Sequence, residues 1–419
     1  MTPKHWIVFG VAIGCVCLPT PAFAARAGML DDSFGRAGKV YLKDVSGYPG
    51  AVEVGRRGRI VAAGFGGNQW ADGAPMKLVR LRPHGELDRS FDHDGVRYTS
   101  FHARASADAI SLGRRGGIVA AGLACADEDT CDIAVVRYKR DGQPDRSFGR
   151  RGKVRLDFGP YDFASGVERV SHHRLLIAGG TCPENAGCDI VLVRLKRDGT
   201  LDRSFGSGGE VITDYDSTPA PGGCPRSGGA SDMDRDARGR IVVGGTCAHG
   251  DVALARFMPD GDPDRSFGND GKVRRDMALE GASYLMVDSR DRIDVSGLVD
   301  RKRSARNRYG YSVARFGRRG GLDRSFGKRG RTATVSKGGT AMDLDSRRRI
   351  VLAGGSLFEF VRFKASGHRD HSFGHRGVAT VGKHDWGYGW VLSMTTDSRD
   401  RIIAAGFKRR HFTIVRVHG

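Results

Sequence analysis

The sequence predicts an all-β protein, a seven-bladed β-propeller built from four-stranded antiparallel blades. The first observation is a motif of the form Leu/Pro-Asp-x-Ser-Phe-Gly, which recurs along the chain with a period of about 57 residues. The second is that every unit holds four short strand-like runs and shows no helical periodicity. Four short strands in a unit of about 40–60 residues are typical of a propeller blade. The motif serines are Ser33, Ser90, Ser147, Ser204, Ser266, Ser325 and Ser372.

Each unit contains its four strands in a fixed order. A strand after Ser-Phe-Gly, such as 153–156, is followed by a variable loop and a strand of small residues, such as 107–110. A tight turn rich in arginine and glycine leads into the most apolar strand, for example 60–64. A second variable loop precedes a strand such as 191–195, and an Asp-Gly pair then turns the chain into the next motif. Asp-Gly between alternating strands is a strong hairpin signal, so the unit is an antiparallel meander.

The position of each strand within a blade follows from the size of its side chains. The small-residue strand fits innermost, where space is tightest, and the strand after Ser-Phe-Gly is then outermost. The chain begins with an outermost strand and ends, at 411–417, with the third strand of an incomplete unit. We therefore expect the 30–41 strand to pair with the C-terminal blade and close the ring, which removes free sheet edges.

Residues 1–24 are predicted to be a secretory signal peptide. Lys4 and His5 precede an apolar run from Trp6 to Cys17, and Ala22-Phe23-Ala24 is an A-x-A cleavage signal. The run is too short to span a bilayer, and no later segment of the mature chain is apolar enough to do so. A lipoprotein site at Cys15 is the alternative, although it lacks a leucine three residues upstream. We expect an exported protein, periplasmic or extracellular.

Residues 25–419 are then expected to form one propeller and a monomer. The units are 30–86, 87–143, 144–200, 201–262, 263–321, 322–368 and 369–419.

The cysteines of the mature chain favour disulfide bonds. Two pairs have Cys-x5-Cys spacing at the same place in adjacent units, Cys125 with Cys131 and Cys182 with Cys188. This spacing suits a bridge across the base of a loop between antiparallel strands. Cys247 stands at the position of Cys182 in its own unit, which leaves Cys224 as its partner. A zinc site is the competing interpretation, but the loops lack Cys-x2-Cys spacing.

The net charge of +20 predicts attraction to polyanions. The alternative is that arginine-rich composition only gives a soluble surface. The possible partners are an anionic glycan, lipopolysaccharide or a protein, and the export signal argues against nucleic acid.

The repeated motif resembles that of the bacterial delta-60 repeat proteins. The resemblance rests on Leu-Asp-x-Ser-Phe-Gly-x-x-Gly, Gly-Arg-Ile-Val-Ala-Ala-Gly and Val-Arg-Tyr-x-x-Asp-Gly, and it covers essentially the whole mature chain. It implies a secreted or cell-surface β-propeller without an established catalytic function. Two departures are local: Asp92 replaces the glycine after Phe91, and Arg369 replaces the Leu or Pro before Asp370.

An arginine in the preceding strand matches the aspartate of every motif. Register through the Asp-Gly turn places Arg80 nearly opposite Ser90 and Phe91, with Asp88 diagonal to it. A residue required once per blade is expected to serve the blade, so we interpret the pairs as structural anchors rather than a binding ring. Arg416 would pair with Asp31 across the closure. The aspartates are Asp31, Asp88, Asp145, Asp202, Asp264, Asp323 and Asp370; the arginines are Arg80, Arg137, Arg194, Arg256, Arg315, Arg362 and Arg416.

No catalytic residue, metal site or cofactor is assigned from the sequence. Asp232, Asp234 and Asp236 resemble the start of a calcium loop, but the glycine and the late glutamate of an EF-hand are missing. No Ser-His-Asp or Cys-His order and no phosphate-binding glycine loop occurs. A pair of carboxylates for glycoside cleavage cannot be selected, because sequence does not give their separation.

The variable loops are the candidate ligand face, because two loops of every blade open on the same side. Aromatic residues interleaved with arginine and lysine suit stacking on sugars while pairing with anionic groups. The alternative is that these aromatic residues cap the apolar ends of the blades. The candidates are Tyr48, Trp70, Tyr161, Arg303, Arg306, Arg308, Trp386, Tyr388, Trp390 and Arg409.

Together these features favour a non-enzymatic binding or scaffold protein that presents a basic, aromatic loop face to an anionic glycan or a protein. A secreted propeller lyase or glycosidase is the second hypothesis, and a purely structural envelope protein is the third. Catalytic groups would be expected near the central channel.

Overall fold

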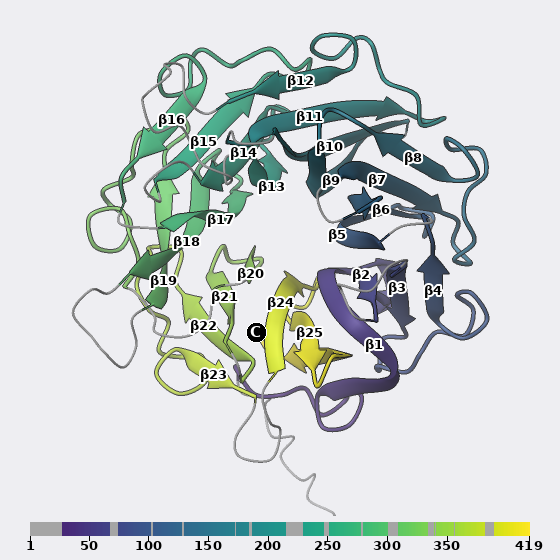
Figure 1. The fold of residues 1–419 in the computed structure, drawn as a ribbon. Coiled ribbons are helices and arrows are strands. Elements are labelled where there is room, and N and C mark those ends of the chain that lie inside the picture. The colour runs from purple at the N-terminus through teal and green to yellow at the C-terminus, as the bar shows by residue number, and fades with distance from the viewer. Residues whose placement is uncertain are drawn as a thin grey trace, which may run out of the picture.

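The computed structural model is almost entirely β-structure, and its sheets follow one another around a common axis (Figure 1). This arrangement confirms the predicted all-β class and the antiparallel sheets. Among the described residues the only helical segment is a short 3-10 turn, η1 (Arg56–Gly58). The structure describes residues 27–67, 74–101, 104–127, 130–171, 173–183, 187–214, 229–246, 251–277, 280–300, 309–333, 339, 341–355, 357–381 and 389–419.

A seven-stranded sheet joins the two ends of the chain. Its order is β24 (Gly389–Thr396), β25 (Ile402–Lys408), β26 (His411–Val417), β1 (Lys39–Val54), β2 (Ile60–Gly66), β3 (Met76–Leu81) and β4 (Val96–Thr99). The long strand β1 serves two units, because Lys39–Tyr41 pairs with β26 and Gly47–Val54 pairs with β2. The sequence suggested two separate strands here, whereas the backbone continues through both without a break.

The eight-stranded sheet also contains two repeats. One comprises β5 (Arg104–Leu112), β6 (Ile118–Cys125), β7 (Cys131–Tyr138) and β8 (Lys153–Leu156). The other comprises β9 (Tyr161–Ser171), β10 (Arg174–Cys182), β11 (Asp189–Lys196) and β12 (Glu210–Thr213). A single parallel bridge between Cys131 and Tyr161 joins their backbones, so the two halves are separate meanders that otherwise meet through side-chain packing.

Three further sheets complete the chain. The first comprises β13 (Ala230–Arg235), β14 (Ile241–Thr246), β15 (Val252–Phe257) and β16 (Lys272–Arg275). The second has only three strands, β17 (Glu280–Val287), β18 (Ile293–Asp300) and β19 (Tyr309–Phe316), and its fourth position is reduced to a bridge between Ala314 and Arg331. The third comprises β20 (Ala341–Leu344), β21 (Ile350–Gly354), β22 (Glu359–Phe363) and β23 (Val378–Thr380).

In each repeat the small-residue strand lies nearest the axis and the strand after Ser-Phe-Gly lies at the periphery, as Figure 1 shows for β13 and β16. The turns between first and second strands, and between third and fourth strands, therefore share one end of the molecule. We call this end the turn face. The variable loops share the opposite end, which we call the loop face.

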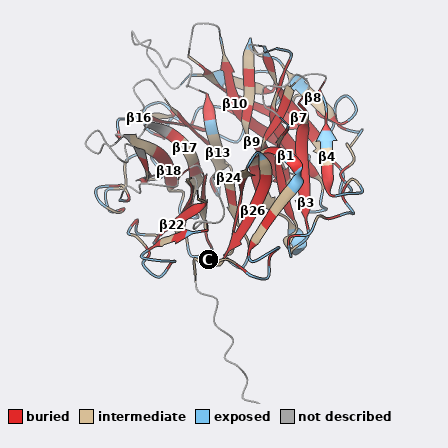
Figure 2. Cartoon of the chain, turned by 60° about the horizontal axis from the view of Figure 1, so that its bottom comes forward, coloured by how far each residue is buried: buried red, intermediate tan, exposed pale blue. Residues whose placement is uncertain are grey.

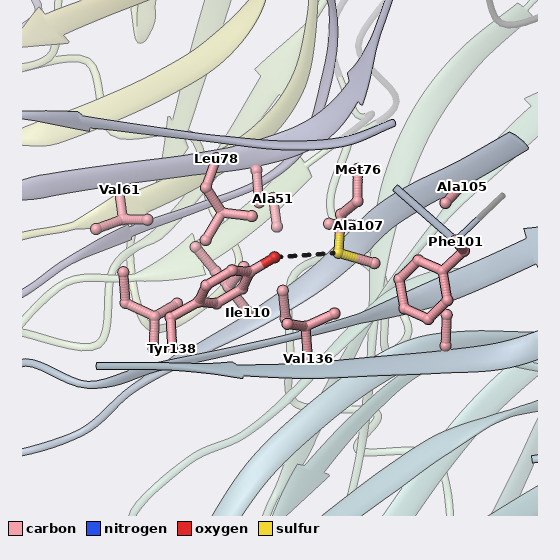
Figure 3. Packing of buried hydrophobic residues seen from close by; sticks show 14 of the residues in the cluster. Ala51, Val61, Met76, Leu78, Phe101, Ala105, Ala107, Ile110, Val136 and Tyr138 are labelled. Atoms are coloured by element: carbon pink, nitrogen blue, oxygen red, sulfur yellow. Dashed lines mark hydrogen bonds between the residues drawn. The ribbon is translucent and has the colours of Figure 1, made fainter. Parts of the chain in front are cut away.

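The core lies between neighbouring sheets, and the second strand of each repeat is buried on both sides (Figure 2). The seven motif phenylalanines are at most 1% exposed, because each is covered by the next sheet. Figure 3 shows one such interface, where Leu78 and Met76 of one repeat pack against Val136 and Tyr138 of the next. Tyr138 Oη lies 2.7 Å from Thr99 Oγ1, so its polar end is satisfied inside an apolar cluster.

Two disulfide bonds confirm two of the three predicted pairs. Cys125 is bonded to Cys131, and Cys182 to Cys188. Each bridges a loop between the second and third strands of its repeat, at the loop face. Cys224 and Cys247 lie outside the described residues.

Replacing both Cys125 and Cys131 with serine is expected to lower the free energy of unfolding by about 2 kcal/mol, because a closed loop of this length restricts the unfolded chain. Urea unfolding of the oxidised protein measures the change. Wild type treated with a reductant should lose at least as much. An unchanged midpoint would contradict this contribution.

No helix in the described part of the chain has the length and apolar character needed to cross a membrane.

Candidate functional site

Most motif aspartates form ion pairs with their arginines, and these pairs are buried or, for Arg137 with Asp145, half-buried. Arg80 Nε donates to Asp88 Oδ2 at 2.9 Å, and its Nη2 donates to Ser90 Oγ at 3.0 Å. The guanidinium carbon of Arg80 lies 4.6 Å from the centre of the Phe91 ring. Corresponding ion pairs join Arg137 to Asp145, Arg194 to Asp202, Arg256 to Asp264, Arg362 to Asp370 and Arg416 to Asp31.

The same arginines also connect neighbouring repeats. Arg80 Nη1 donates to the carbonyl of Arg140, and Arg194 Nη1 donates to that of Pro259 at 2.7 Å. Each of these guanidinium groups stacks on phenylalanine, pairs with aspartate and donates to the next turn. Most of its N–H donors therefore already have acceptors within the protein. These arginines therefore hold sheets together and are not available to a ligand.

The fifth repeat departs from this scheme and corrects the predicted pair of Arg315 with Asp323. Arg315 Nε and Nη2 donate to Asp294 at 2.6 and 2.8 Å, and Asp294 is fully buried. Asp294 lies directly opposite Arg315 on β18, where the second repeat has Val119 opposite Arg137. Because Asp294 lies closer to the guanidinium, the Asp323 carboxylate bonds only to Ser325 among the residues that the structure describes.

The N-terminal segment supplies the turn of the last repeat that faces the β20–β23 sheet. At an ordinary junction the amide of a motif glycine donates to the turn of the next repeat, as Gly149 does to the carbonyl of Asp198 at 2.6 Å. At the junction between the β20–β23 sheet and the last repeat, Gly374 donates to the carbonyl of Ala27 at 2.8 Å. Gly28 has φ +89°, the same value as the turn glycine Gly199, so residues 27–28 take the place of the turn.

Asp92 fits the glycine position that it occupies. Its φ is +46°, close to that of the motif glycines, and its amide donates to Asp141 at 2.8 Å. Aspartate tolerates this left-handed conformation better than most residues. The substitution therefore leaves the turn in place.

Half-buried acids lie on the inner strands, near the axis where the enzyme hypothesis expects catalytic groups. Glu53 Oε2 accepts from the Leu112 amide at 3.0 Å, and Asp343 Oδ2 accepts from the Thr396 amide at 2.6 Å. Burial raises the pKa of Glu53 to about 7 and that of Asp343 to about 6. Each carboxylate joins one inner strand to the next, which gives it a structural role.

The suspected calcium loop has the same structural role. Asp232 Oδ2 accepts from the Leu285 amide at 2.9 Å, and Asp234 Oδ2 accepts from the Val287 amide at 2.7 Å. Asp236 accepts from the side chain and backbone of Arg240. All three carboxylates have protein partners, which favours the structural interpretation over calcium at this position.

A row of partly exposed aromatic side chains lies at the loop end of the seam between the last and first repeats. Trp390 on β24 is 46% exposed and lies opposite Phe407 on β25. The Phe407 ring is 4.4 Å from that of Tyr48 on β1, which stacks on Phe65 of β2 at 5.1 Å. We call Trp390, Phe407, Tyr48 and Phe65 the aromatic row. It crosses four strands drawn from both ends of the sequence (Figure 1).

Basic residues border the aromatic row. Arg409 and Arg410 form the turn after β25, where both side chains are exposed, and the Arg410 carbonyl accepts from Gly47 at 2.7 Å. Lys77 is buried beneath the row and donates to the carbonyl of Ser46. Its Nζ lies 4.8 Å from the Tyr98 ring centre, and burial lowers its pKa to about 8.

The structure therefore brings together three of the predicted ligand-face residues, Tyr48, Trp390 and Arg409. Tyr161 lies on β9, near Phe163 and away from the row. The other candidates lie outside the described residues: Trp70, Arg303, Arg306, Arg308, Trp386 and Tyr388.

Sequence reasoning missed Phe65 and Phe407, although a signal was present. Both directly follow the Ala-Ala-Gly of an apolar strand, at the same position of their repeats. The sequence places these repeats first and last, so their contact became evident only in the folded seam.

Cavities on the turn face are lined by arginine. One of about 210 Å³ lies between the first two repeats, and its Arg80 also contacts the buried Asp88. A second, of about 490 Å³, is lined by Arg174, Lys196 and Arg197 with His173, Ser147 and Asp198. The arginines of the first cavity are Arg56, Arg57, Arg59, Arg80, Arg114, Arg115 and Arg140. This basic face follows from the arginine-rich tight turns.

Comparison with known proteins supports the β-propeller fold. Residues 174–205 and 239–267 match a family described as a "Domain of unknown function (DUF5122) beta-propeller". These matched segments include the motifs around Asp202 and Asp264. A search of curated protein sequences found no match.

Several solved propeller structures resemble the chain at low identity. YCF48 bound to a D1 peptide is 11% identical, with a TM-score of 0.49, and the match covers 96% of this chain and 100% of that one. The polysaccharide lyase Uly1 is 10% identical, with a TM-score of 0.49 and coverage of 94% and 97%. The WD40 propeller domain of Doa1 is 11% identical, with a TM-score of 0.46 and coverage of 90% and 96%. We infer no function from these likenesses.

Proposed function

We propose that the protein is an exported, seven-bladed β-propeller of the delta-60 repeat type, closed by its N-terminal strand, that binds an anionic glycan. The pairing of β1 with β26, the ion pair between Arg416 and Asp31, and the contact between Gly374 and Ala27 support the closed ring. Two disulfide bonds support an oxidising destination, and with it the signal peptide over residues 1–24.

The aromatic row carries the proposed binding function. Partly exposed tryptophan, tyrosine and phenylalanine side chains in a continuous row are uncommon on a surface that binds nothing. Their faces suit the apolar faces of sugar rings, and the rings are held by strands rather than by loops alone. Tyr48 is fixed between Phe65 and Phe407, so little conformational entropy would be lost on binding.

The bordering charges favour an acidic glycan, including lipopolysaccharide, over a neutral one. Arg409 and Arg410 lie at the edge of the row and are exposed. An arginine guanidinium binds carboxylate, sulfate or phosphate groups through paired hydrogen bonds. A protein partner with an acidic surface is the alternative ligand. In both cases the protein would bind its ligand as a monomer.

Replacing Trp390 with alanine is expected to weaken glycan binding at least about tenfold, because an exposed aromatic anchor contributes strongly to a contact surface. The measurement is titration with uronate-containing, sulfated and neutral glycans at several salt concentrations. Binding by the wild type should weaken steeply with salt if charge contributes. The double replacement of Arg409 and Arg410 with alanine should reduce that salt dependence.

Met258→Ala is the matched control, since Met258 is 39% exposed and belongs to a hairpin on the turn face. Equal binding of all glycan classes by the wild type at low salt would reject a glycan function. Cleavage of a polyuronate, seen as release of unsaturated products, would instead favour the lyase hypothesis.

A further inference from the structure

Three aspartates converge at the loop face between the second and third repeats. Asp132 begins β7, Asp157 follows β8, and Asp162 lies in β9. Each offers one carboxylate oxygen, and the three oxygens lie within 4.8 Å of one another. The Cys125–Cys131 disulfide adjoins Asp132, so strands and a crosslink hold the group in place.

Asp162 is the member that a structural role explains least. Its side chain is completely buried, and its Oδ2 accepts from the amides of Phe158 and Gly159. Its Oδ1 is also buried but accepts no hydrogen bond in the described part of the chain. Burial raises the pKa of the Asp162 carboxyl, and the nearby Thr181 hydroxyl offsets that rise only in part. A buried, unpaired carboxylate oxygen is costly unless something else coordinates it.

The neighbouring junctions show what normally fills this place. The sixth residue after the motif serine is basic at four of the seven motifs, and three of these basic side chains contact the loop of the previous repeat. Lys272 Nζ lies 2.9 Å from Asp214 Oδ1, while Lys153 donates to the carbonyl of Ser100 and Arg331 to that of Met277. Asp214 holds the position in its repeat that Asp157 holds in the second.

The junction with the three aspartates lacks this basic group, because Glu210 occupies the corresponding position. One arginine is present: Arg155 pairs with Asp132 Oδ2 at 2.5 Å and is 41% exposed. It offsets only one of the three carboxylates. The site therefore has an excess of negative charge where the next junction has an ammonium group.

We propose that a divalent cation, with calcium as the best fit, binds Asp132, Asp157 and Asp162. Calcium prefers hard oxygen ligands at about 2.3–2.6 Å, and three oxygens that lie within 4.8 Å of one another can converge on one ion with a shift of a few tenths of an ångström at most. Water can complete its coordination at the exposed Asp157 side. The ion would replace the lysine of the neighbouring junction and tie the second repeat to the third.

The test uses the folded full chain after a chelator has removed bound cations. Calcium is then titrated into it, and calorimetry and thermal unfolding measure binding and stability. We expect one ion per chain with a Kd of about 10⁻⁴–10⁻³ M, and a rise in Tm of about 2 °C or more at saturating calcium. Magnesium should bind more weakly, because it requires a tighter octahedral site. Absence of both heat and stabilisation in wild type would overturn the proposal.

Two variants make the test specific. Asp157→Asn removes a ligand from an exposed position and should weaken calcium binding at least tenfold, whereas the exposed Asp32→Asn should leave it unchanged. Glu210→Lys introduces the basic group of the other junctions and should raise the calcium-free Tm while lowering calcium affinity. If Asp157→Asn or Glu210→Lys binds calcium like wild type, the ion is not at this cluster.

Discussion

Asp31→Ala is expected to lower the free energy of unfolding by about 3–5 kcal/mol, because it leaves a buried guanidinium without its carboxylate. Arg416 Nε donates to Asp31 Oδ2 at 2.7 Å, and the two residues are only 2% and 3% exposed. Arg401 also lies 3.3 Å from the same oxygen, so two positive charges lose one partner. The expected loss is large because these contacts join opposite ends of the chain.

Asp323→Ala is the matched control within the same protein. Asp323 occupies the same motif position and makes the same turn contacts to Ser325 as Asp31 makes to Ser33. Its expected counterpart, Arg315, is bound to Asp294 instead. We therefore expect Asp323→Ala to cost only about 1 kcal/mol, the value of a local hydrogen-bonded turn.

Chemical denaturation of the two variants and the wild type measures this contrast. Equal losses for Asp31→Ala and Asp323→Ala would show that the turn, and not the ion pair across the seam, provides the stability. If the unfolding midpoint of Asp31→Ala falls while the denaturant slope stays unchanged, the variant has lost stability without a change in the compactness of its folded and unfolded states.

The repeat, the strand order and the Arg–Asp pairs could be predicted because each depends on local pattern and register. Counting through an Asp-Gly turn is sufficient to place Arg80 beside Asp88. The exchange at Arg315 could not be predicted in this way. It depends on which of two carboxylates lies nearer to one guanidinium, and Asp294 comes from a different strand.

The candidate site was only partly predictable for a related reason. Tyr48, Trp390 and Arg409 stood out as aromatic or basic loop residues, and the expected ring closure brings repeats one and seven side by side. No sequence pattern, however, gives the contact of Tyr48 with Phe407. The Asp132 cluster is distributed over two strands and one loop of two repeats, and each aspartate alone resembles a loop residue. Each of these sites combines residues of two neighbouring repeats, whereas a sequence motif describes the residues of one repeat only.

The second large effect is on pH dependence: we expect Tm to rise as pH falls from 8 to about 5. Burial raises the pKa of several inner-strand acids in the folded state, to about 7 for Glu53 and Asp232 and about 6 for Asp108, Asp234 and Asp343. In the unfolded chain these groups have ordinary values near 4. The folded protein therefore binds more protons than the unfolded chain between about pH 4 and 7, and stability is lost as pH rises through that window.

The motif aspartates set the acid limit of the same profile. The pKa values of Asp31, Asp88, Asp145, Asp202, Asp264 and Asp370 are lowered in the folded state. That of Asp88 falls to about 2, because hydrogen bonds from Ser90 and Arg59 and the charge of Arg80 together outweigh burial. A carboxyl with a lowered pKa contributes stability above about pH 4 and loses it as pH falls toward the folded value. The two sets of acids have opposite signs, so the stability maximum should lie between about pH 4 and 6.

Glu53→Gln tests how much an inner-strand acid contributes to the pH dependence of Tm, apart from the other titratable groups. Glutamine can still accept from the Leu112 amide but cannot ionise, so the variant should gain stability at pH 8 and show a flatter profile between pH 5 and 8. The loss below pH 4 should remain, because Asp88 and its counterparts are unchanged. A wild-type Tm that falls steadily from pH 8 to 5 would mean that Glu53 and its counterparts are ionised in the folded protein. Their hydrogen bonds between neighbouring inner strands would then be sufficient to hold buried charge around the axis.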